Sequence, residues 1–151
     1  MQIDDYKYAS IFIENRRLDI KDINRIVDKI RHYYDVSTNI TSKIGLTTGG
    51  THNFSDSKIE NAIVNMAEYQ NKELAAVNEF MKKCEALNRI GDPDGAYIIY
   101  KYCILGKKMD DISKEVMMSK RTCYRHLDIA VEELDYYLMV KYGDSFDEDI
   151  I

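Results

Sequence analysis

The stretch from residue 110 to residue 127 reads DDISKEVMMSKRTCYRHL. Its apolar residues form two pairs with a spacing of four, Ile112 with Val116 and Cys123 with Leu127. Residues four apart lie on the same face of a helix, so the stretch predicts two amphipathic helices joined by a short turn. This is the outline of a helix-turn-helix motif.

The second of these helices has the character of a recognition helix. Asp110 is the expected N-cap of the first helix and Ser119 that of the second, because their side-chain oxygens can accept from the unpaired N–H groups of a first turn. A recognition helix needs long hydrogen-bond donors on its exposed side and small or apolar residues behind them. The residues expected on the exposed side are Lys120, Arg121, Thr122, Tyr124 and Arg125.

Positive charge is concentrated around this motif, although the whole chain is acidic. The formal net charge is −5, which argues against a uniformly basic nucleic-acid-binding protein. Residues 97–127 nevertheless hold seven basic and three acidic side chains, whereas residues 128–151 hold one basic and eight acidic ones. A solvated helix face can also gather cations, so the charge alone leaves both interpretations open. Its coincidence with the helix-turn-helix pattern favours DNA binding.

The composition favours an all-α protein of the cytoplasm. Apolar residues make up 45% of the chain and there is one Pro. The three widely spaced Cys and three scattered His predict neither a disulfide framework nor a metal site. No stretch approaches the ~20 apolar residues of a membrane span, and the first residues lack a signal-peptide pattern. We expect no membrane contact, no cofactor and, since no catalytic or phosphate-loop pattern is present, no enzymatic activity.

Two long helices are predicted before the motif. From about residue 5 to residue 35, apolar residues recur at steps of three and four with Arg16 as the exception, which is typical of a helical hairpin or coiled coil. A break near residues 18–21 is left open, and the interleaved charges indicate a solvated face. The second helix is expected to start at the capping box Ser57–Glu60 and to run to about residue 88. The main apolar residues of its predicted seam are Ile59, Ile63, Met66, Leu74, Val77, Met81 and Cys84.

The chain is expected to divide at the segment GDPDG, residues 91–95. Asp92 is the predicted N-cap of the next helix and Pro93 its first residue. We expect residues 1–91 to form a long-helix hairpin or oligomerisation region with a flexible linker at 36–56, residues 92–142 to form the helix-turn-helix domain, and residues 143–151 to form an acidic tail. The seams of the long helices can pack on each other or on a second chain, and the sequence leaves both open.

Three stretches together resemble the C-terminal helix-turn-helix of bacterial sigma factors: YIIYKYCILGKK at 97–108, DDISKEV at 110–116 and MSKRTCYRHL at 118–127. The whole chain, with two long helices, a Gly-Gly linker at 49–50 and a late helix-turn-helix, resembles the ArpU/RinA-type phage regulators. That resemblance implies a transcriptional activator of late packaging and morphogenesis genes. Two positions depart from the pattern. Met117 stands where a Gly is usual in the turn and Ser113 where an Ala is usual, and Met at a positive φ is strained, so another turn geometry stays open.

The expected function is sequence-specific binding of double-stranded DNA in a promoter or upstream region. The residues expected to contact DNA are Lys107, Lys108, Ser119, Lys120, Arg121, Thr122, Tyr124 and Arg125. Arginine pairs bidentately with guanine and is a candidate base reader, whereas lysines, hydroxyls and helix N-terminal amides suit phosphates. RNA polymerase and a second copy of the chain are the other expected partners. The alternatives are a helical protein–protein adaptor and a small terminase subunit that binds phage DNA for packaging.

Overall fold

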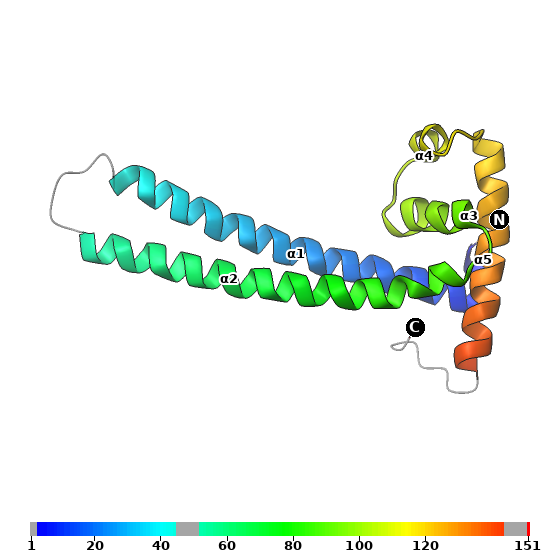
Figure 1. Cartoon of the computed structure of the whole chain (residues 1–151), viewed down its shortest axis with the longest axis horizontal. Helices are drawn as coiled ribbons and strands as arrows, with labels where there is room; N and C mark the ends of the chain where they lie inside the picture. The colour runs from blue at the N-terminus through cyan, green and yellow to red at the C-terminus, as the bar shows by residue number, and fades with distance from the viewer. Residues whose placement is uncertain (1–2, 45–51, 144–150) are drawn as a thin grey trace. The chain divides into compact units, whose positions relative to one another are not determined.

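The protein is all-α, as the sequence predicts. A computed structural model describes residues 3–44, 52–143 and 151, and every regular element in those ranges is helical (Figure 1). The elements run in the order η1 (Ile3–Asp5), α1 (Lys7–Ile44), α2 (His52–Lys83), η2 (Cys84–Arg89), α3 (Pro93–Ile98), η3 (Ile99–Ile104), α4 (Met109–Glu115) and α5 (Lys120–Tyr142). None of the helices in these ranges has both the length and the apolar character that a bilayer crossing requires.

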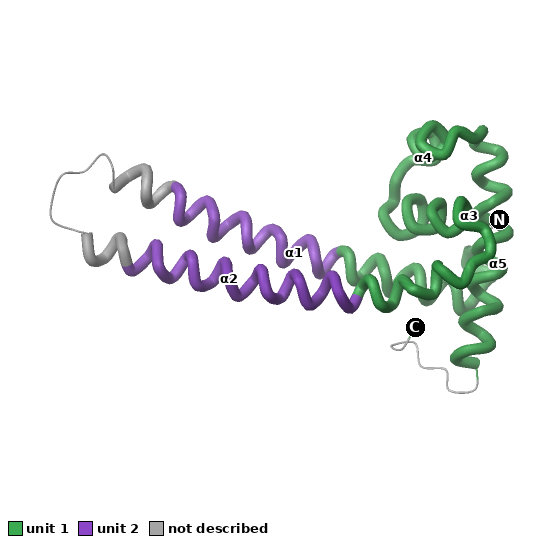
Figure 2. Tube along the Cα trace, viewed as in Figure 1, with its two compact units in different colours: residues 1–20, 80–151 green, residues 21–79 purple. Residues whose placement is uncertain are grey.

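The chain forms two compact units, which Figure 2 colours separately. Unit 1 contains residues 1–20 and 80–151, so the beginning of α1 belongs with the helix-turn-helix. Unit 2 contains residues 21–79, the remainder of α1 and most of α2. The boundary expected at residue 91 therefore does not coincide with the division by contacts.

Unit 1 is built around α5, the predicted last helix. The side chains of α5 that are buried repeat at three- and four-residue steps and are Cys123, Leu127, Ala130, Val131, Leu134 and Leu138. Helix α3 lies so close to α5 that a Cβ on Gly95 would be 2.7 Å from the Ala130 Cβ. That distance is shorter than carbon atoms tolerate, so the absence of a side chain at Gly95 permits this packing.

The start of α1 is fixed to α5 by a carboxylate. Asp135 Oδ1 accepts hydrogen bonds from the backbone N–H groups of Tyr8, at 2.8 Å, and Ala9, at 3.0 Å. The first turn of α1 contains no acidic residue of its own. Asp135 therefore supplies from another helix the acceptor that an N-cap normally provides.

Arg16 is the exception in the apolar seam, and the structure buries it. Its side chain is 2% exposed, its Nε lies 2.8 Å from Asp19 Oδ2, and its Nη1 donates to the Ile151 carbonyl at 2.8 Å. The guanidinium also lies over the Phe12 ring, 5.0 Å from its centroid. For Arg16 the expectation of a solvated basic face is therefore wrong, because its donors are satisfied inside unit 1.

Unit 2 is a pair of helical segments that contact through an aromatic stack. The rings of Tyr33 on α1 and Tyr69 on α2 stack with their centroids 5.7 Å apart. Among the described side chains of this unit only Ala62 is fully buried; Ile26, Ile30 and Met66 are half-buried. The contact between the two segments therefore covers only part of their apolar surface.

Several predicted helix boundaries are wrong. Helix α1 passes through residues 18–21 without a break and continues to Ile44, and α2 begins at His52. Helical turns consequently occupy much of the expected linker at 36–56, and the expected start at Ser57 lies inside α2. Gly49 and Gly50 lie outside the described residues, as do residues 144–150 of the acidic tail.

Candidate nucleic-acid interface

The turn between α4 and α5 has the left-handed geometry usual for a helix-turn-helix, even though Met replaces Gly. Met117 has φ of +56°, a left-handed value. The N–H of Met118 donates to the Ser113 carbonyl at 3.1 Å and the N–H of Met117 to the Lys114 carbonyl at 3.4 Å. These two bonds define a Schellman motif, which closes a helix by satisfying its last carbonyls. The Met117 side chain is 91% exposed and so meets no packing obstacle.

The start of α5 confirms the predicted N-cap. Ser119 has extended backbone angles, and its Oγ accepts from the Thr122 N–H at 3.2 Å and donates to the Thr122 Oγ1 at 2.9 Å. The prediction for α4 is wrong by two residues. The cap position is Lys108, which makes no side-chain cap bond, and Asp110 lies in the first turn. The helix begins at Met109, whose side chain is buried.

The structure brings most of the predicted contact residues to the exposed side of the motif. Lys107 and Lys108 are exposed in the segment before α4, and Ser119 is exposed ahead of α5. Thr122 is half-buried, and the exposed residues in the first two turns of α5 include Lys120, Arg121, Tyr124 and Arg125. Behind them, Cys123 is 0% exposed and Leu127 3%. This division of polar and apolar faces is the one that the sequence predicts.

Lys120 differs from its neighbours because it is already paired. Its Nζ lies 2.6 Å from Asp110 Oδ1, so the first turns of α4 and α5 are joined across the motif. The hydrogen bond lowers the pKa of Asp110 and raises that of Lys120. Both side chains are more than half exposed, so this ion pair contributes little to stability.

Arg121 and Arg125 carry the positive charge that is available to a ligand. Within the part of the chain that the structure describes, neither guanidinium makes an ion pair or hydrogen bond. They are four residues apart, so both project from the same side of α5. Guanidinium groups in this arrangement can meet guanine edges or phosphates without first breaking an internal contact.

Tyr124 has an aromatic neighbour that the sequence did not identify. Its ring meets the Tyr102 ring edge-on, with centroids 5.9 Å apart. The interaction with Tyr124 raises the pKa of Tyr102. Tyr102 lies in η3, a π-helical segment.

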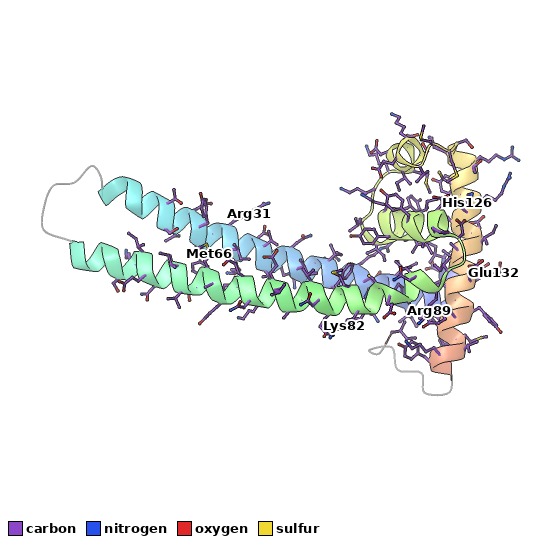
Figure 3. The ribbon with its side chains drawn as sticks, viewed as in Figure 1. Arg31, Met66, Lys82, Arg89, His126 and Glu132 are labelled. Atoms are coloured by element: carbon purple, nitrogen blue, oxygen red, sulfur yellow. The ribbon has the colours of Figure 1, made fainter. Side chains whose placement is uncertain are left out.

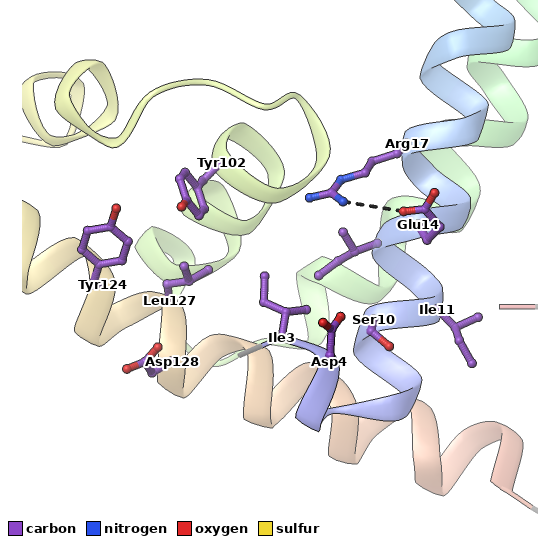
Figure 4. A pocket seen from close by; sticks show the side chains of 11 residues that line it. Ile3, Asp4, Ser10, Ile11, Glu14, Arg17, Tyr102, Tyr124, Leu127 and Asp128 are labelled. Carbon is purple, nitrogen blue, oxygen red and sulfur yellow. Dashed lines mark ion pairs between the residues drawn. The ribbon is translucent and has the colours of Figure 1, made fainter. Parts of the chain in front are cut away.

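Both tyrosines line a cavity of about 840 Å³ beside α5 (Figure 4). Its other walls include Arg17, whose Nε donates to the Cys103 carbonyl at 2.6 Å and whose Nη1 pairs with Glu14 at 3.6 Å. Tyr124 therefore contacts Tyr102 on the side of the cavity, while 42% of the residue's surface remains exposed.

His126 serves the fold of the motif. Its Nδ1 pairs with Asp92 Oδ2, and Figure 3 labels it on α5. Asp92 is the predicted N-cap of α3 and accepts from the Asp94 N–H at 3.0 Å. The hydrogen bond with His126 is the main cause that lowers the pKa of Asp92. A second contact, Tyr97 Oη to Glu115 Oε2 at 2.5 Å, joins α3 to the end of α4.

Comparison of the chain with family models, with curated proteins and with solved structures gives no match.

Proposed function

We propose that this chain is a sequence-specific DNA-binding protein that regulates transcription through the α4–α5 helix-turn-helix. The observation that carries the proposal is the pair Arg121 and Arg125, exposed on the face of α5 that follows a left-handed Schellman turn. A turn of that kind sets the second helix across the first so that its N-terminal residues can enter a major groove.

In the proposed complex, the beginning of α5 lies in the major groove. Arg121 and Arg125 donate to guanine O6 and N7 or to phosphate, and Tyr124 packs against a thymine methyl or bonds a phosphate. Lys107 and Lys108, on the approach to α4, contact the phosphate backbone. Such contacts set the affinity and its dependence on salt.

The regulatory role is supported by the resemblance to phage late-gene activators in the sequence. In this proposal the protein binds promoter or upstream DNA and activates late genes, with RNA polymerase as a further partner. The two alternative functions, a protein–protein adaptor and a small terminase subunit, make different predictions. An adaptor does not retain DNA at low salt, and a terminase subunit forms a ring of many copies.

The test begins with selection of bound sequences from random double-stranded DNA, followed by affinity measurements on the selected site. Arg121→Ala and Arg125→Ala are each expected to cost about 1–3 kcal/mol and to relax the preference at one or two base pairs. Arg89→Ala is the matched control, since Arg89 is exposed in η2, outside the motif. Unchanged affinity and preference in both α5 variants would overturn the proposal.

A further inference from the structure

Helix α2 carries a second apolar face that its contact with α1 does not cover. On the first face lie the buried Ala62 and the half-buried Met66 and Tyr69, the last of which stacks on α1. The second face is rotated from it by about 120°, at 100° per residue. Its large side chains remain exposed: Ile63 is 49% exposed, Val64 56% and Leu74 62%.

The second face forms a continuous neutral stripe along α2. In order of sequence its residues are Ile63, Val64, Ala67, Gln70, Asn71, Leu74, Val77 and Asn78. None of them is charged, although Glu68, Lys72 and Glu79 follow one another on the remaining face of the same helix. A stripe without charge has no cations to neutralise phosphates and no opposite charge for a strongly charged protein surface.

The stripe is complementary to itself when the second copy runs antiparallel. A two-fold axis between Gln70 and Asn71 places Gln70 opposite Asn71 of the second copy, and each amide has both donors and an acceptor. The same axis places the small Ala67 opposite the large Leu74 at the centre of the stripe, and Val64 level with Val77 at its edges. Small residues facing large ones allow two helices to interdigitate closely.

We propose that this stripe is a homodimer interface in which α2 pairs antiparallel with α2 of a second copy of the chain. From Val64 to Val77 the helix rises about 20 Å, which is long enough for several layers of contact. The α1 and α2 segments of the two copies together make a four-helix assembly, and the exposed side chains of Ile63 and Leu74 become covered. The proposal concerns unit 2 alone and does not depend on DNA binding.

The first test measures the mass of the full chain in solution by light scattering, without DNA. The expected result is a particle of two 17.6-kDa chains. Leu74→Lys is expected to raise the dimer dissociation constant at least ~100-fold, because each interface contains the changed residue twice. Asn61→Lys, which adds the same charge on the charged face of α2, is expected to leave it unchanged. A monomer at all concentrations, or a dimer insensitive to Leu74→Lys, would overturn the proposal.

A size exchange tests the predicted pairing and separates it from misfolding. Ala67→Leu and Leu74→Ala alone are each expected to weaken the dimer about tenfold or more, by overpacking and by a cavity. The double variant exchanges the two sizes across the axis and is expected to recover most of the affinity. Additive losses in the double variant would contradict this register.

Crosslinking tests the direction of the two helices. In a Cys84→Ser background, a mixture of Ala67→Cys and Leu74→Cys proteins is expected to form the mixed disulfide in preference to either same-site disulfide. The other native thiols, Cys103 and Cys123, are buried. Preferential Ala67→Cys to Ala67→Cys crosslinking would show a parallel pair and overturn the antiparallel arrangement.

Discussion

Lys120 Nζ lies 2.6 Å from the carboxylate of Asp110, so the proposed DNA-binding surface contains a negative charge next to Lys120. The lysine can move to a phosphate only by leaving its partner. The carboxylate then remains near the DNA backbone and opposes binding. This pair therefore limits affinity in the proposed complex.

Replacing Asp110 by Asn should accordingly strengthen DNA binding. We expect an increase of ~3- to 10-fold in affinity at moderate salt and a steeper salt dependence, because Lys120 becomes free to release a counterion. The measurement is a titration of the selected DNA site at two salt concentrations. Glu132→Gln, the same charge change at an exposed position further along α5, is expected to have little effect. Weaker binding by the Asp110 variant would contradict the proposed surface.

Met117→Gly should stabilise unit 1. The left-handed conformation costs a Met residue about 1–2 kcal/mol, and Gly avoids this cost but loses more chain entropy. We expect the free energy of unfolding to rise by up to about 1 kcal/mol. Met117→Val should lower it, since a β-branched residue fits a positive φ less well. Chemical denaturation of the two variants measures these changes in the free energy of unfolding. Changes of the same sign in both variants would contradict a strained left-handed conformation at Met117.

Gly95→Ala should destabilise unit 1. The added Cβ would lie 2.7 Å from the Ala130 Cβ and 3.1 Å from the His126 carbonyl oxygen, neither of which is a flexible side-chain end. We expect a loss of about 1–3 kcal/mol in the free energy of unfolding. Gly91→Ala is the matched control, because the nearest atom there is the Glu133 carboxylate oxygen at 3.6 Å. Its effect should remain within about 0.5 kcal/mol.

The Asp92–His126 pair should make stability fall in acid. The pKa of Asp92 is lowered in the folded state, chiefly by its hydrogen bond with His126 and further by the Gly95 and Asp94 N–H groups. A lowered carboxyl pKa contributes stability above the unfolded-state value, near 4, and that contribution is lost as the pH falls through the folded value. Asp92→Asn keeps an N-cap but removes the titrating group. Unfolding measured from pH 6 to pH 2.5 should show a smaller acid-dependent loss for the variant than for the native chain.

The sequence predicted the helix-turn-helix more accurately than the long helices. Four-residue spacing identified Cys123 and Leu127 as buried, and the motif placed the left-handed residue at Met117. The spacing could not distinguish which apolar residues of α2 face α1, because two adjacent faces of that helix are apolar. Ile63 and Leu74, expected in the seam, are exposed, whereas Ala62 is buried.

Most of the structural features that the sequence did not predict are contacts between residues far apart in the chain. Tyr102 of η3 meets Tyr124 of α5, a contact between two helices. Asp135 appeared only as one of many acids near the end of the chain. Its role as acceptor for the first turn of α1 depends on the packing of residues more than a hundred positions apart. Periodicity describes one helix at a time and contains no information on such pairs.

The contact between Asp135 and the start of α1 also links that first turn to the helix that begins at Lys120. A single uninterrupted helix extends from Lys120 to Tyr142, and about 21 Å of it separates Arg121 from Asp135. The carboxylate that accepts from the amides of Tyr8 and Ala9 thus belongs to the same helix as the exposed arginines. The position of the first turn of α1 is therefore tied to the helix that presents Arg121 and Arg125.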